Sequence, residues 1–374
     1  MANILHKRKA ADPSASDLTV GELAINTSDG GLFTKTSGGS VVEVGSGGGG
    51  VSSDALRNTL GGTNAGDSLD GGSESDDNTF FGYDAGTDIT DGRKNTFIGS
   101  YAGANTASGC YHNTFVGYQA GENNDNDNWN TGVGSGALQN NAAWQNTGVG
   151  AYAGNANTTG TKNVFLGRSA AMANTTGSYN IAIGYESLKT NTTGSDSIAI
   201  GEEALKSQTT ANSNIGIGSD SLKFTTTGSW NVAVGDSSGE DITTGAGNTV
   251  LGHKALFSAT TATSCVVIGR NSGGAITTGS NNIVIGYAAE PSANSVSHEI
   301  TLGDTDITKF RIPGIGLTAT DDGISTDGVF IENGQTVTAN YTITDGKNAG
   351  SFGPITINSG ITVTVGAGEH WTVI

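Results

Sequence analysis

Residues 180–188 read NIAIGYESL, and residues 197–205 read SIAIGEEAL, seventeen positions further along the chain. The same five-residue pattern, with a final glycine and an apolar residue just before it, occurs fourteen times between residues 78 and 303. A fixed period of this kind is the signature of a solenoid, in which each repeat forms one coil. The spacing is 17 residues in every step but two, of 18 and 16, between the closing glycines Gly82, Gly99, Gly117, Gly134, Gly150, Gly167, Gly184, Gly201, Gly218, Gly235, Gly252, Gly269, Gly286 and Gly303.

The residues before each closing glycine predict a short β-strand. The residue one position before the glycine is always apolar, and the residue three positions before it is always β-branched. These two flanking columns share one strand face, and we interpret that face as the core of the coil. The glycine allows a sharp turn or a positive φ in every coil. Small residues three positions later, such as Ala120, indicate close packing, and Thr175-Thr176-Gly177 is one of several turn signals in register.

The middle column, two positions before the glycine, contains no charged and no large polar residue in fourteen coils. A solvated face would not stay so apolar, so we predict that this column packs against sister chains in a parallel homotrimer. The predicted trimer interface consists of Phe80, Phe97, Phe115, Phe165, Ala182, Ala199, Ala233, Val250, Val267 and Val284.

Asparagine occupies the position four residues before the glycine in eleven of the fourteen coils, as at Asn78, Asn163 and Asn231. Stacked in register, these amides would form a hydrogen-bonded ladder along the molecule. The residue also favours turns, so it would mark the beginning of each strand, and the two roles are compatible. The predicted fold is all-β: a parallel β-solenoid, or left-handed β-roll, of about fourteen 17-residue coils and about 65 Å length.

Composition and charge exclude several classes of protein. The net charge of -18 disfavours nucleic acid as a partner. Residues 1–25 lack the apolar core of a signal peptide, and no run of 18 apolar residues predicts membrane insertion. Cys110 and Cys265 are expected to be reduced, buried thiols. The basic run at residues 6–9 is either a solvated tail or a contact for an acidic partner.

The repeat resembles two known groups of proteins. Residues 180–188 are similar to the N-x-A-I-G motifs in the heads of trimeric autotransporter adhesins, which are left-handed β-rolls, and to the NTAIGYxAL arrays of phage tail fibres. An autotransporter would need a signal peptide and a C-terminal membrane anchor, and we expect neither here. The resemblance therefore implies a phage tail fibre.

Residues 1–44 differ from the repeat. LTVGELAINT at 18–27 followed by DGGLFTK at 29–35 resembles the virion-attachment segment of phage tail fibres, notably those of cyanophages. Read by itself, this segment predicts a short β-meander with a turn at Asp29-Gly30-Gly31. The resemblance implies that residues 1–44 bind a tail, baseplate or adaptor protein. Residues 45–77 begin with a glycine-rich joint and form a neck before the shaft at 78–303.

Residues 304–374 depart from the 17-residue period and form a connector and a distal β domain. Alternation predicts strands within 336–343 and 355–365, and the segments at 352–357 and 370–374 resemble the C-terminal ends of cyanophage fibres. We expect receptor contact through the loop that contains Asp345, Lys347 and Asn348, because loops on rigid scaffolds commonly carry recognition.

No motif predicts an enzyme, a cofactor or a metal site. The five histidines have no zinc-ligand spacing, and weak ion binding by the acids of residues 122–128 stays open. The adjacent pairs Glu202-Glu203 and Asp76-Asp77 would point to opposite faces of a strand, so neither pair predicts glycan cleavage. Variable residues directly after the glycines could form a ligand surface or reflect drift: Tyr83, Tyr118, Arg168, Glu202, His253, Arg270 and Tyr287.

These features predict a virion tail-fibre protein, made in the bacterial cytoplasm, that contacts a host-surface glycan or protein. A structural virion connector without receptor contact is the alternative, and a polysaccharide-degrading tailspike is a third possibility.

Overall fold

The computed structural model describes residues 6–9, 14, 18–20, 23–26, 32–35, 37–38, 41–43, 51–54, 56–70, 75–106, 109–125, 127–312, 317–320, 323–326, 336–337, 339–343, 349–351 and 353–373. Every regular element in these residues is a β-strand. The chain divides into two compact units, residues 1–304 and residues 305–374, which are described separately.

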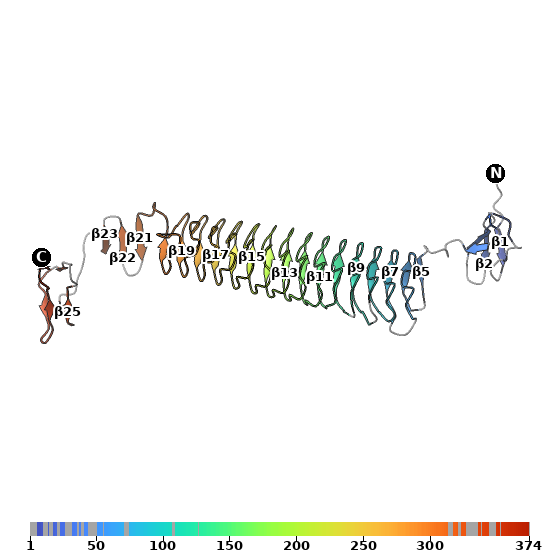
Figure 1. Cartoon of the computed structure of the whole chain (residues 1–374), viewed down its shortest axis with the longest axis horizontal. Helices are drawn as coiled ribbons and strands as arrows, with labels where there is room; N and C mark the ends of the chain where they lie inside the picture. Colours follow the sequence, from blue (N-terminus) through green and yellow to red (C-terminus); the bar gives the residue numbers. More distant parts are fainter. Residues whose placement is uncertain are drawn as a thin grey trace. The chain divides into compact units, whose positions relative to one another are not determined.

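A single 16-stranded sheet forms the solenoid of the first unit (Figure 1). Strands β6 to β20 pair in parallel and in sequence order, one strand per coil, and β5 caps the first coil in antiparallel orientation. The predicted parallel β-solenoid is thus confirmed. The strands are β5 (Val51–Ser53), β6 (Thr59–Gly61), β7 (Thr79–Phe81), β8 (Thr96–Ile98), β9 (Thr114–Val116), β10 (Thr131–Val133), β11 (Thr147–Val149), β12 (Val164–Leu166), β13 (Ile181–Ile183), β14 (Ile198–Ile200), β15 (Ile215–Ile217), β16 (Val232–Val234), β17 (Thr249–Leu251), β18 (Val266–Ile268), β19 (Ile283–Ile285) and β20 (Ile300–Leu302).

The solenoid begins one coil earlier than the sequence analysis placed it. Residues 58–62 read NTLGG and contain β6, which pairs with β7 in the same register as the later strands. The closing glycine of this coil, Gly62, precedes Gly82 by 20 residues, so a search for a 17-residue period does not find it. The coil therefore lies in the segment predicted to be a neck.

The structure reverses the predicted roles of the two strand faces. The middle residue of each strand points into the coil, and the flanking residues point outwards, as the alternating burial of β13 and β14 shows. The ten residues predicted to form the trimer interface are at most 1% exposed within a single chain, so they cannot form an interface between chains: Phe80, Phe97, Phe115, Phe165, Ala182, Ala199, Ala233, Val250, Val267 and Val284.

The reason for this orientation is the volume available inside a 17-residue coil. Where the middle residue is large, the residue four positions after the glycine is small: a side chain at Gly103 would meet the ring of Phe97. In four of the six coils with a small middle residue that position carries leucine, and Leu205 occupies the space beside Gly216. In the other two, side chains from neighbouring positions fill the space, as Leu138 does beside Gly148. Large and small side chains at these positions thus complement one another within a coil or between neighbouring coils, as close packing requires.

The closing glycines bring neighbouring coils close together. From Gly62 to Gly286 their φ angles lie between +116° and +149°, a region that other residues rarely adopt. A Cβ atom at Gly201 would overlap the carbonyl oxygen of Gly218 in the next coil. The predicted positive φ is confirmed, and the close approach of the backbones is a second reason for glycine.

The predicted asparagine ladder is confirmed and lies inside the solenoid. The backbone N–H of Asn180 donates to Oδ1 of Asn163 over 2.8 Å, and its Nδ2 donates to the Gly194 carbonyl over 2.8 Å. Asn180 Oδ1 in turn accepts from the N–H of Ser197 over 3.0 Å. Each buried amide thereby satisfies a turn carbonyl and the first N–H of the next coil, while its own backbone N–H is satisfied by the amide of the preceding coil.

A second ladder, which the sequence analysis missed, lies seven positions after the glycines. It is confined to the middle coils and gives way to Ile89 and Thr106 towards one end and Ile242 towards the other. Side-chain amides link successive coils through Asn124, Asn141, Asn157, Asn174, Asn191 and Gln208, over 2.7–3.2 Å.

Small sheets lie outside the solenoid. Strands β1 (His6–Lys9), β2 (Leu23–Asn26), β3 (Leu32–Lys35) and β4 (Val41–Glu43) form one sheet, of which β2 to β4 are the expected meander. In the second unit β21 (Lys309–Ile312), β22 (Leu317–Thr320) and β23 (Gly323–Thr326) are antiparallel. Three parallel pairs follow, and they describe two short coils: β24 (Thr336–Val337) with β27 (Thr356–Ile357), β25 (Tyr341–Thr342) with β28 (Val363–Thr364), and β26 (Ala349–Ser351) with β29 (Trp371–Val373).

Candidate interaction surfaces

The outer face of the solenoid sheet is uncharged along its whole length and largely apolar. We call the two flanking columns of β7 to β20 the sheet face. They contain only Thr, Val, Ile, Leu and Phe, without a charged residue in any coil. Phe81, Leu166 and Leu251 are 48%, 45% and 48% exposed, although side chains of this type are normally buried. A contiguous apolar surface of this length marks an interaction site.

A second surface, the aromatic strip, lies on the residues five and six positions before the glycines. Its rings interact along the solenoid axis with cations and with one another. Arg93 lies 4.8 Å from the ring centroid of Tyr111, and the rings of His112 and Trp129 are parallel at 6.4 Å. The strip covers six consecutive coils and consists of Arg93, Tyr111, His112, Trp129, Trp144, Lys162 and Tyr179.

The variable residues directly after the closing glycines are exposed, as a ligand surface would require. In the first coils tyrosines of this region pack against each other: Tyr101 is edge-to-face with Tyr83 at 5.4 Å and with Tyr118 at 6.2 Å. Further along, Arg168 lies over Tyr185 at 5.5 Å. These tyrosines thus have stacking partners within the chain.

An ion-pair ladder crosses three coils in the middle of the solenoid. Lys206 Nζ lies 2.8 Å from Glu186 and 2.7 Å from Glu203, and Lys223 Nζ lies 2.7 Å from Glu203. Hydrogen bonds from Lys189 and Lys206 lower the pKa of Glu186 from 4.5 to about 2. The pKa of Glu203 is lowered as well, by hydrogen bonds from Lys206 and Lys223. These carboxylates are held ionised as structural groups.

The carboxylate pairs weighed for glycan cleavage have structural partners. Arg57 binds Asp77 over 2.6 Å and Asp76 over 3.1 Å, and its hydrogen bond to Asp77 lowers the pKa of that carboxyl. Glu203 belongs to the ion-pair ladder, while its neighbour Glu202 is exposed. In the residues 122–128, burial and the charge of Asp125 raise the pKa of Asp127 to about 6. No group of three or more metal-ligating side chains occurs among the described residues.

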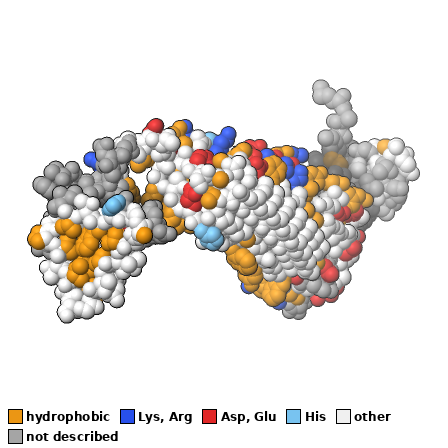
Figure 2. Space-filling view, turned by 60° about the vertical axis from the view of Figure 1, so that its left-hand side comes forward, with side chains coloured by type: hydrophobic (Ala, Val, Ile, Leu, Met, Phe, Trp, Pro, Cys, Tyr) orange, Lys and Arg blue, Asp and Glu red, His pale blue; other side chains and the backbone are white. Residues whose placement is uncertain are grey.

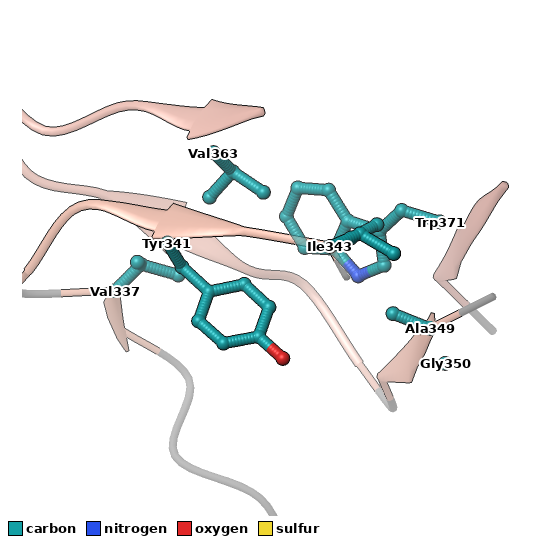
Figure 3. Close-up of a pocket in the computed structure, with 7 residues that line it drawn as sticks. All are labelled: Val337, Tyr341, Ile343, Ala349, Gly350, Val363 and Trp371. Atoms are coloured by element: carbon teal, nitrogen blue, oxygen red, sulfur yellow. The ribbon is translucent and has the colours of Figure 1, made fainter. Parts of the chain in front are cut away.

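The loop predicted to contact a receptor, with Asp345, Lys347 and Asn348, lies outside the described residues. The two short coils of the second unit line an open apolar cavity of about 250 Å³ (Figure 3). Its walls come from five of the six short strands, and Figure 2 shows hydrophobic side chains gathered on one face of this unit. The lining residues are Val337, Tyr341, Ile343, Ala349, Gly350, Val363 and Trp371.

Comparisons with known proteins leave the chain without an assigned family: no family model, no curated protein and no solved structure matches it. Among the described residues, no helix is long and apolar enough to span a membrane.

Proposed function

We propose that the chain is a phage tail-fibre protein in which the solenoid is a rigid shaft. Residues 1–44 bind a tail, baseplate or adaptor protein, and the region 304–374 contacts a glycan or protein on the host surface. The observation that carries this proposal is a long solenoid with an outer face that is uncharged and largely apolar in every coil, because a shaft made of several chains needs such a face. The attachment-like motif at 18–35 supports the assignment of the N-terminus.

The shaft is a parallel homotrimer that associates through the sheet face. Three copies around one axis bury the same flanking columns, from Thr79 and Phe81 to Ile300 and Leu302, against one another. The number three follows the resemblance to trimeric adhesin heads, and the apolar sheet face supports self-association. In contrast to the middle column, these side chains are accessible on a single chain.

Immunogold labelling of the virus particle that encodes the chain tests the proposal. Antibodies against residues 305–374 should label the tips of tail fibres, and the purified chain should block adsorption of the particle to its host. Particles that carry no label would refute the proposal. Labelled particles whose adsorption is not blocked would favour the connector without receptor contact.

A further inference from the structure

Three of the five rings of the aromatic strip lie in a backbone conformation that does not favour bulky side chains. Residues five positions before the glycines adopt a left-handed conformation, with φ of 59° at His112, Trp129 and Tyr179. Other coils fill the same position with residues that tolerate this conformation, such as Asp196 (φ 59°) and Asn281 (φ 55°). Tryptophan is therefore not required by the fold, and it is the more costly choice.

The strain of this backbone conformation is not offset by burial of the aromatic side chains. Trp129, Trp144 and Tyr179 are 53%, 54% and 53% exposed. Two of them are oriented by a neighbour: Trp129 stacks on His112, and Lys162 Nζ lies 5.1 Å from the ring centroid of Tyr179 and 3.2 Å from its hydroxyl oxygen. The result is a series of oriented, accessible rings with cationic groups between them, which is typical of a binding surface.

The spacing of the strip suits a linear polymer. Successive coils of a parallel sheet lie about 4.8 Å apart, so six coils present rings and cations along about 24 Å. Nucleic acid also offers stacking rings, but the chain's net charge of -18 opposes a polyanion of that charge density. A polysaccharide offers flat pyranose faces to the rings and hydroxyl groups to Lys162, His112 and the exposed Gln145.

We propose that the aromatic strip binds a linear polysaccharide along the side of the shaft. This rests on the proposed function in that it names the chemical class and the place of one host-surface contact. It places a glycan site on the shaft, distinct from the distal region.

The test is native gel electrophoresis of the full chain through gels that contain hydroxyethyl cellulose, dextran or alginate. At least one of the three polymers should retard the wild-type chain. The double variant Trp129→Asn, Trp144→Asn should bind that polymer at least tenfold more weakly. It should melt at the same temperature or higher, because asparagine tolerates the positive φ of Trp129 and because Asn128 already holds the position equivalent to Trp144 in the preceding coil. The control Trp230→Asn changes an exposed tryptophan with φ of 60° three coils beyond Tyr179 and should leave binding unchanged.

Three results would overturn the proposal: no retardation of the wild-type chain by any of the three polymers, equal retardation of the double variant, or a lower oligomer mass of the double variant in light scattering. The last result would assign the strip to an interface between copies. The proposed function has its own test: virus particles without antibody label would refute it. A chain that blocks adsorption to the host but binds none of the three polymers would leave the proposed function standing and overturn only the polysaccharide site.

Discussion

At the residue scale, each coil contains positions at which any other residue would lower the stability of the fold. The closing glycine is the clearest case, because it combines a φ angle near +136° with contact between backbones of neighbouring coils. A side chain there meets a carbonyl oxygen, which cannot rotate away. Asn180 has a comparable position, since its one buried amide satisfies the carbonyl of Gly194 and the N–H of Ser197 in the next coil.

Gly201→Ala is expected to destabilise the solenoid by about 2–4 kcal/mol, because the Cβ atom forces neighbouring coils apart in a strained conformation. Gly247→Asn is the matched control. Gly247 also has a positive φ, of 68°, but the nearest atom to a Cβ there is 3.8 Å away, so a cost below about 1 kcal/mol is expected. Urea unfolding followed by circular dichroism measures both, and equal effects would contradict the role of the contact.

Asn180→Ala should cost about 1–3 kcal/mol, because it leaves the N–H of Ser197 buried without its partner and removes one of the two hydrogen bonds that the carbonyl of Gly194 accepts. Asn180→Ser should cost less, since the next coil already has Ser197 at the equivalent position, and its hydroxyl accepts a hydrogen bond from the N–H of Asn214 over 3.4 Å. Unfolding in urea again provides the measurement. Identical losses in the two variants would show that the amide ladder does not act through these hydrogen bonds.

At the element scale, the repeat predicted the strands, the turns and the ladder, but not which face of the strand is inside. All three strand positions are apolar or β-branched, as in Ile198-Ala199-Ile200, and alternation alone fits either orientation. The deciding signal was the volume relation between the middle column and the residue four positions after the glycine, as in Phe97 with Gly103. The two positions are six residues apart in the sequence. Their volumes can be compared only once both side chains are known to lie in the same core.

The candidate surfaces were predictable to a smaller extent. The variable residues directly after the glycines were predicted to be exposed because their residue types follow no pattern, and the structure shows that they are exposed. The aromatic strip was missed because its members alternate between two positions of the repeat, so Trp129 and Trp144 do not stand in one column. The sheet face was missed because an apolar column was read as the coil core, although a coil this small has room for only the middle residue of each strand.

The ion-pair ladder gives the solenoid a pH dependence of defined sign. The pKa of Glu186 is about 2 in the folded chain, against an ordinary value of 4.5, so its contribution to stability is full above pH about 4.5 and is lost as the pH falls towards 2. Glu186→Gln with Glu203→Gln should remove that contribution. The midpoint urea concentration of unfolding at pH 6 should therefore be higher for the wild-type chain than for the variant. This difference in midpoint should shrink as the pH falls from 4.5 to 2. Glu202→Gln is the exposed control on the same coil, and a constant difference across this range would contradict the ladder.

At the scale of the whole molecule, the orientation of the strand makes self-association testable with neighbouring residues. Two outward residues, Ile200 and Val234, belong to the sheet face, while Ala199, the residue before Ile200 in β14, is fully buried. A carboxylate placed outwards meets water in a monomer and a sister chain in a trimer. A carboxylate placed inwards meets the apolar interior of its own coil in either state.

Ile200→Glu with Val234→Glu should therefore yield a folded monomer. Light scattering should give about 37.5 kDa for this variant, against three times that mass for the wild-type chain, and circular dichroism should be unchanged because the coil interior is intact. Ala199→Glu should instead lose β structure, since the solenoid has no space or partner for a charge at that position. A wild-type monomer would refute association through the sheet face. If Ala199→Glu folds and dissociates into monomers, the interface between chains is formed by the middle column. The flanking residues would then form the interior of the coil.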